Sequence, residues 1–120
     1  MGNVTLGVIG CGGMGSDLAR NAQKLDHATV AVVSDLDESR AKDLAEDIES
    51  TYVTDYTELL ARDDIDAVLI ASPPFMHRQM TEAAAEAGKH VFCEKPMSPT
   101  LADCDAMTSA VTEAGVKFQI

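Results

Sequence analysis

The sequence predicts an α/β fold in which a doubly wound parallel sheet carries helices on both faces. Short runs rich in β-branched residues alternate with longer segments of helical period. The runs are apolar nearly throughout, as expected for strands that are buried on both sides. Six runs and five helical segments follow one another without a linker or repeat. The right-handed crossover rule then gives the strand order 3-2-1-4-5-6.

The first half of the chain is expected to form three strands separated by two helices. The strands are predicted at residues 4–9, 28–33 and 51–53. The second of these, ATVAVV, is the most continuously apolar. The helix at 14–25 has four residues at helical spacing that we expect to face the sheet: Met14, Leu18, Ala22 and Leu25. The helix at 39–48 has the same pattern, with Ala41, Leu44, Ala45 and Ile48 facing inward.

The second half continues the alternation, and its helices have recognisable ends. Asp55 and Glu58 have the spacing of a capping box, which predicts a short helix at 56–61. A strand at 66–71, a helix at 75–87 and a strand at 89–93 follow, and then a helix at 100–114 and a strand at 116–120. Gly88 and Gly115 are placed to form left-handed C-terminal caps. Because the chain ends within the last strand, we expect it to be one domain of a longer protein.

The charge of the chain is strongly negative and unevenly distributed. Of the formal net charge of −11, residues 35–66 contribute most, with twelve acidic residues against three basic ones. Such a segment is typical of a solvated acidic face, and adaptation to a salty cytoplasm is a second explanation. Nucleic acids and anionic membranes are poor partners for this surface, so neither is expected to bind.

The cysteines and the N-terminus indicate a cytoplasmic protein without a metal. Cys11, Cys93 and Cys104 are odd in number, are not closely spaced, and form no cluster at metal-ligand spacing. The N-terminus enters a strand pattern directly, without a basic and then apolar leader. No apolar run approaches the ~20 residues that span a bilayer.

A glycine-rich loop at residues 10–15 (GCGGMG) follows the first predicted strand and opens a helix. Free N–H groups and the dipole at a helix N-terminus favour an anion, and glycines allow a pyrophosphate to approach the backbone. Gly10 would make the tight turn, Gly12 would admit the phosphates, and Gly15 would let the helix pack closely on the strand. The predicted phosphate-binding residues are Gly10, Gly12, Gly13, Met14 and Gly15.

An acidic residue at the end of the second strand completes the pattern. Asp35 lies twenty residues beyond Gly15, where a carboxylate accepts hydrogen bonds from the hydroxyls of the adenosine ribose. It would repel a 2′-phosphate, so NAD is favoured over NADP. Arg40 could stack on the adenine or pair with a 2′-phosphate, and we favour stacking. Asp35 or Asp37 could also cap the next helix, which is compatible with a role at the ribose.

Two further segments stand where predicted strands end, at the edge where ligands bind in such sheets. They are 71–77 (ASPPFMH) after the fourth strand and 94–96 (EKP) after the fifth. Together with the glycine loop, they resemble the N-terminal domain of the Gfo/Idh/MocA oxidoreductases, the family of glucose-fructose oxidoreductase and inositol dehydrogenase. The resemblance covers the whole chain, and EKP is its most specific element.

The resemblance implies roles for residues in both segments. It implies cofactor contacts by Ser72, Pro73, Pro74, His77, Glu94, Lys95 and Pro96. Lys95 would also be catalytic, because an ammonium beside the hydroxyl being oxidised stabilises the developing alkoxide. From the residues alone, Glu94 and Lys95 could instead form an exposed ion pair, and His77 could be a helix-start residue.

The family implies an NAD(P)-dependent dehydrogenase that acts on a sugar, inositol or related polyol and associates as a homo-oligomer. A second domain would supply a histidine and most of the substrate pocket, so residues 1–120 are expected to bind the cofactor without turnover. Two alternatives remain open. The first is a non-catalytic NAD-binding regulator of the same family, and the second is a methyltransferase-type Rossmann domain, which EKP and Gly15 disfavour.

Overall fold

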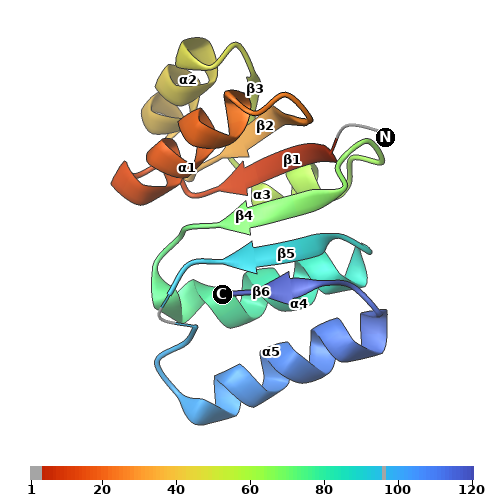
Figure 1. The fold of residues 1–120 in the computed structure, drawn as a ribbon. Coiled ribbons are helices and arrows are strands. Elements are labelled where there is room, and N and C mark those ends of the chain that lie inside the picture. Colours follow the sequence, from red (N-terminus) through yellow and green to blue (C-terminus); the bar gives the residue numbers. More distant parts are fainter. Residues whose placement is uncertain (1–3, 96) are drawn as a thin grey trace.

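The computed structural model describes residues 4–95 and 97–120, and it shows one parallel sheet with helices on both faces (Figure 1). The strand order is β3-β2-β1-β4-β5-β6, which confirms the prediction. The strands are β1 (Val4–Ile9), β2 (Ala28–Ser34), β3 (Thr51–Val53), β4 (Ala67–Ile70), β5 (His90–Cys93) and β6 (Phe118–Gln119). The helices are α1 (Gly13–Gln23), α2 (Glu38–Asp47), α3 (Tyr56–Leu60), the 3₁₀ helix η1 (Pro74–Met76), α4 (His77–Glu86) and α5 (Leu101–Ala114).

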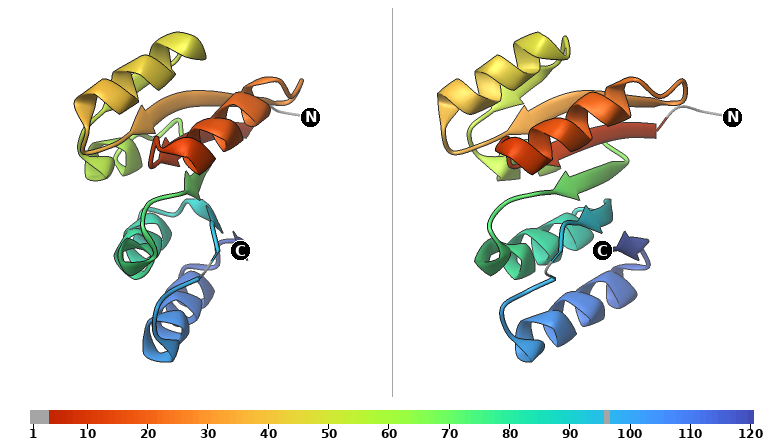
Figure 2. Two further views of the ribbon diagram at one scale, coloured as in Figure 1. Left: turned by 90° about the vertical axis from the view of Figure 1, so that its left-hand side faces the viewer. Right: turned by 60° about the vertical axis from the view of Figure 1, so that its left-hand side comes forward.

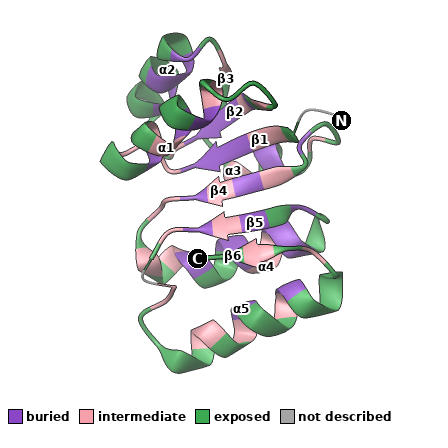
Figure 3. Ribbon diagram, viewed as in Figure 1, coloured by how far each residue is buried: buried purple, intermediate pink, exposed green. Residues whose placement is uncertain are grey.

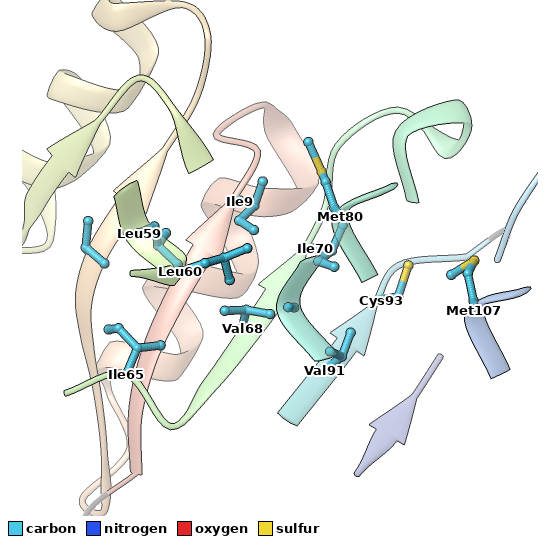
Figure 4. Packing of buried hydrophobic residues seen from close by; sticks show 12 residues of the cluster. Ile9, Leu59, Leu60, Ile65, Val68, Ile70, Met80, Val91, Cys93 and Met107 are labelled. Carbon is cyan, nitrogen blue, oxygen red and sulfur yellow. The ribbon is translucent and has the colours of Figure 1, made fainter. Parts of the chain in front are cut away.

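Helices cover the sheet in layers (Figure 2), and the residues between the layers are buried (Figure 3). Two clusters of buried side chains hold these layers together. One joins α1 and α2 to the sheet, and it includes all four residues expected to face inward from α2: Ala41, Leu44, Ala45 and Ile48. The other cluster lies on the opposite face and joins β1, β4 and β5 to α3, α4 and α5 (Figure 4). Met107 from α5 and Met80 from α4 belong to it. Few aromatic rings are needed, because Val, Ile, Leu, Ala and Met fill both clusters.

The expected inward face of α1 is only partly correct: Ala22 is buried and Leu18 is half-buried, but the other two residues are not. Met14 and Leu25 are 56% and 53% exposed, and the buried residues of the helix are Gly15, Ala19 and Ala22. Small residues face the sheet because α1 approaches β1 so closely that a Cβ on Gly15 would lie 1.8 Å from the Gly10 carbonyl oxygen. A helix at that distance has no room for long side chains beneath it.

The predicted helix at 75–87 is divided into η1 and α4. Pro74 occupies the first turn of η1, where its missing N–H is tolerated, and Met76 N donates to Pro73 O at 2.9 Å. The predicted C-terminal caps are confirmed, because Gly88 and Gly115 have φ values of +77° and +71°. Asp55 caps α3 by accepting a hydrogen bond from Thr57 N.

The strand register brings four strand ends to one edge of the sheet. Ile9 at the end of β1 pairs with Ser34 at the end of β2 and with Ile70 at the end of β4. Ile70 in turn pairs with Cys93 at the end of β5. The segments that carry the glycine loop, Asp35, Ser72 and Glu94 therefore leave the sheet side by side, at the edge where parallel sheets bind ligands.

Candidate functional site

The glycine loop is fixed between the ends of β2 and β4. Gly10 N donates to Ser34 O at 2.8 Å, and the φ of Gly10 is +102°, which side chains rarely adopt. A Cβ at this position would lie 2.7–2.8 Å from backbone atoms of Ala71 and Ser72. A Cβ on Gly15 would in turn collide with the carbonyl oxygen of Gly10. The fold itself therefore requires glycine at positions 10 and 15.

The middle of the loop faces open space. A Cβ on Gly12 or Gly13 would meet no atom within 4 Å. Gly12 is the N-cap of α1 and has an extended backbone. It has no side chain that could accept from the first N–H groups of the helix, and the first turn holds no acidic residue. The first N–H groups of a helix lack partners within the helix, and they attract anions. The loop therefore fits a pyrophosphate, which would occupy the space that a side chain would fill.

Asp35 joins the glycine loop to the loop after β2. Its Oδ2 accepts from Cys11 N at 2.8 Å, and its Oδ1 accepts from Asp37 N at 2.9 Å. These bonds hold the half-buried carboxylate in place, and each oxygen keeps a lone pair for a hydroxyl group. The capping role belongs to Asp37, which accepts from Arg40 N at 3.3 Å at the start of α2. Asp35 is thus available to a ribose.

A cavity of about 610 Å³ lies at this edge of the sheet and brings together residues from four loops. Six of the predicted site residues line it: Gly10, Gly12, Asp35, Arg40, Ser72 and Pro73. Nine further lining residues were not predicted, and most of them are apolar: Ile9, Ser34, Leu36, Thr54, Tyr56, Ala71, Phe75, Met76 and Met80. Their apolar surface suits a flat heteroaromatic ring such as adenine.

Two of the missed residues had a signal in the sequence. Leu36 and Phe75 are 86% and 71% exposed, although both are large and apolar. Leu36 stands between two aspartates directly after a strand, and Phe75 follows two prolines. An exposed apolar residue in a polar loop at the carboxyl end of a strand indicates a ligand contact.

Arg40 lines the same cavity as Asp35, and its side chain is 61% exposed. Its Nε lies 3.7 Å from Asp37 Oδ2, a loose ion pair on the surface. The guanidinium is thus close to Asp37 and free to reorient toward a ligand, so both stacking on adenine and contact with a phosphate remain compatible with its position.

The segments after β4 and β5 meet next to the cavity. Ser72 Oγ donates to Met80 Sδ at 2.9 Å, and Glu94 N donates to Ile70 O at 2.8 Å. Glu94 is half-buried, whereas Lys95 is exposed. Among the described residues, no ion pair joins Glu94 to Lys95, and neither lines the cavity.

The remaining predicted site residues lie around these elements. Gly13 and Met14 form the exposed start of α1, and Pro74 begins η1. His77 is 1% exposed, and its ring lies between two backbone carbonyls. Pro96, the last of the predicted residues, falls outside the described residues.

A second depression of the same volume, about 610 Å³, lies at the other end of α1. It is lined by Arg20, Gln23, Lys24, Leu25, Asp26, Ala28, Thr29, Asp47, Ile48 and Glu49. It faces the start of β2 rather than the carboxyl ends of the strands, and the described residues that line it include neither the glycine loop nor a helix N-terminus. The cavity beside Asp35 is therefore the candidate site.

The cysteines beside the site are not poised for chemistry. Burial and the nearby Asp35 carboxylate raise the pKa of Cys11 to about 12, and its Sγ lies 3.4 Å from Ser34 O. Burial likewise raises the pKa of Cys93 to about 12. The described residues include no group of His, Cys, Asp or Glu that could hold a metal ion. In the same part of the chain, every helix is too short or too polar to cross a membrane.

A glycine loop that opens a helix, a fixed carboxylate at the end of β2 and a cavity between them define a dinucleotide-binding Rossmann domain. Comparison with protein families agrees. Residues 4–120 match the family described as "Oxidoreductase family, NAD-binding Rossmann fold" (Gfo/Idh/MocA), and the chain belongs to this family as an NAD-binding domain.

Individual relatives support the assignment. The chain is 40% identical to an uncharacterized oxidoreductase, YrbE, of Bacillus subtilis strain 168, over 98% of the chain and 35% of the relative. It is 40% identical to myo-inositol 2-dehydrogenase of Thermotoga maritima, over 92% of the chain and 34% of the enzyme. The crystal structure of scyllo-inositol dehydrogenase from Lactobacillus casei with NAD(H) and scyllo-inositol superimposes with a TM-score of 0.91. That enzyme is 28% identical, and the match covers 98% of the chain and 35% of the enzyme. The chain thus spans about a third of the length of the curated relatives it matches.

Proposed function

We propose that this chain is the cofactor-binding half of an NAD-dependent dehydrogenase that oxidises a carbinol group of a sugar, inositol or related polyol. The observation that carries the proposal is the common strand edge, which places the segment with Glu94 and Lys95 one strand away from the loop that lines the cavity. Relatives named as inositol dehydrogenases support the substrate class.

The glycine loop and Asp35 hold the adenosine half of the cofactor in this proposal. The N–H groups at the start of α1 bind the pyrophosphate, and the Asp35 carboxylate accepts from the ribose hydroxyls. Because Cys11 N and Asp37 N fix both of its oxygens, Asp35 cannot turn away from a 2′-phosphate. We therefore expect the chain to prefer NADH to NADPH.

Glu94 and Lys95 act at the nicotinamide half. The Glu94 carboxylate accepts from the ribose next to the nicotinamide, and the exposed Lys95 ammonium donates to the substrate hydroxyl. The bound nicotinamide supplies the acceptor for the two electrons that leave the carbinol. As the hydroxyl loses its proton, Lys95 stabilises the negative charge that develops on its oxygen. The remainder of the protein would supply the proton acceptor and the rest of the substrate pocket.

The cellular setting belongs to the same proposal. The three free cysteines, two of them buried, support a reducing compartment such as the cytoplasm. We expect the longer protein to assemble as a homo-oligomer, as its resemblance to the family implies.

Equilibrium titration of the chain with NADH, NADPH and S-adenosylmethionine tests the proposal. NADH should bind most tightly, NADPH about tenfold or more weakly, and S-adenosylmethionine not at all, because it lacks a pyrophosphate for the glycine loop. The chain alone should not oxidise polyols. Preferential binding of S-adenosylmethionine would refute the proposed function, and tighter binding of NADPH would refute the role of Asp35.

A further inference from the structure

We propose that His77 is a positioning residue that holds the Glu94–Lys95 segment in place for the nicotinamide half of the cofactor, rather than a residue that contacts the cofactor. This inference rests on the proposed function of Glu94 and Lys95. His77 is the first residue of α4, it is 1% exposed, and it does not line the cavity. A side chain so placed acts through its neighbours.

The ring of His77 connects two loops that leave adjacent strands. Its Nε2 lies 2.7 Å from Ser72 O, in the loop after β4. Its Nδ1 lies 3.1 Å from Met97 O, two residues beyond Lys95 in the loop after β5. Carbonyl oxygens only accept, so a neutral ring donates to one of the two carbonyls, and it donates to both when each nitrogen carries hydrogen. One buried side chain thus links the loop that borders the cavity to the segment that carries the predicted catalytic lysine.

The described residues after β5 are held at several points. At its start, Glu94 N donates to Ile70 O, and at its far end Ser98 Oγ donates to Asp103 Oδ2 at 3.2 Å. Between these two points, Lys95 is exposed. The side chain of Met97 packs against the core cluster that joins α4 and α5 to the sheet, and the contact of His77 with Met97 O adds a polar restraint on the backbone of the same residue.

The adenosine half is anchored independently of His77. Asp35 accepts from Cys11 N and Asp37 N, and Gly10 N donates to Ser34 O; none of these bonds involves His77. Loss of the imidazole should therefore affect the two halves of the cofactor unequally. A general loss of stability would weaken the binding of both halves together, which separates positioning from a structural role.

Two amide substitutions separate the two contacts of the ring, one with Met97 O and one with Ser72 O. In His77→Asn, the side-chain amide nitrogen lies near the position of Nδ1 and can still donate to Met97 O. In His77→Gln, it lies near the position of Nε2 and can donate only to Ser72 O. If the restraint on the segment after β5 matters, His77→Asn should resemble the natural chain, and His77→Gln should resemble His77→Ala.

Hydrogen exchange of the ligand-free chain provides the first test. In His77→Gln and His77→Ala, the amides of Lys95, Met97 and Ser98 should exchange about tenfold faster, the effect of losing one hydrogen bond to the Met97 carbonyl, while α1 and β2 stay unchanged. His77→Asn should remain within about threefold of the natural chain. Unchanged exchange at these three amides in His77→Gln, or faster exchange throughout the domain, would overturn the proposal.

Binding of NADH and ADP-ribose provides the second test. ADP-ribose carries the adenosine and both phosphates but lacks the nicotinamide, so it serves as the internal control. His77→Gln should weaken NADH about tenfold and leave ADP-ribose within twofold, with NADH affinity restored in His77→Asn. Equal losses for both ligands would overturn the positioning role. Equal affinities of the natural chain for NADH and ADP-ribose would instead count against the proposed function of Glu94, whatever the exchange data show.

Discussion

Replacement of Gly15 by alanine should destabilise the whole domain. The added Cβ would lie 1.8 Å from the carbonyl oxygen of Gly10 and 2.9 Å from its carbonyl carbon. Both are backbone atoms of a loop that is held to β2 and β4, so no flexible side chain can move aside. To reach even 3.0 Å from that oxygen, α1 would have to retreat by about 1.2 Å, away from the sheet that it covers.

Such a shift disrupts the packing of Ala19 and Ala22 against the sheet. Overpacking of this kind costs about 3 kcal/mol. For a domain of this size, that loss corresponds to a fall in Tm of roughly 10 °C or more. Thermal unfolding followed by circular dichroism measures the change.

Gly12→Ala is the matched control. Its Cβ would meet no atom within 4 Å, and the backbone of Gly12 (φ −73°, ψ −166°) is open to any residue. We expect its Tm to stay within about 2 °C of the natural chain. NADH affinity should nevertheless fall about tenfold or more, because the methyl group enters the space for the pyrophosphate. A Gly15→Ala chain as stable as Gly12→Ala would refute the packing argument, and undiminished NADH binding by Gly12→Ala would refute the phosphate site.

Three further predictions concern charge. Asp35→Ser should reduce the preference for NADH over NADPH about tenfold, as measured by fluorescence titration. An unchanged ratio of the two affinities would show that residues other than Asp35 set the preference. At pH 8, a thiol reagent should modify Cys104 rapidly but Cys11 and Cys93 only on unfolding, and rapid labelling of all three would contradict the burial of Cys11 and Cys93. Because the pKa values of Cys11 and Cys93 are raised from 9.0 to about 12, the free energy of unfolding should fall as pH rises from 9 to 12. NADH affinity should rise a few-fold between about 0.01 M and 0.15 M salt, because salt screens the acidic segment at 35–66, whereas neutral adenosine should show no such change.

The parts of the fold that were predicted correctly depend on local pattern. The strand order follows from the alternation of elements and the handedness of their connections, and the inward face of α2 follows from its apolar period. Met14 and Leu25 were wrongly placed on the inner face of α1, because hydrophobic spacing does not reveal how closely a helix approaches its sheet. Gly15 sets that distance, and it makes small residues fit where the longer Met14 does not.

The candidate site shows the same division. The glycine loop and Asp35 were found from spacing, since their relation to the strands fixes where they lie. The hydrogen bonds of Asp35 to Cys11 N and Asp37 N depend on backbone direction, which spacing does not give. The contact of His77 with Met97 O joins residues twenty apart through tertiary packing, so it was not predicted: the residues alone indicated the start of a helix, and the resemblance implied a cofactor contact.

The location of the dinucleotide can be measured directly by an NMR titration of the chain with NADH. The two depressions have equal volumes and lie at opposite ends of α1, so the experiment has a built-in comparison. We predict that amide shifts change at Gly12, Asp35 and Ser72, with saturation at one equivalent. Residues of the other depression, such as Lys24 and Glu49, should not respond. Saturable shifts at Lys24 and Glu49 with none at Gly12 and Asp35 would contradict the assignment of the site.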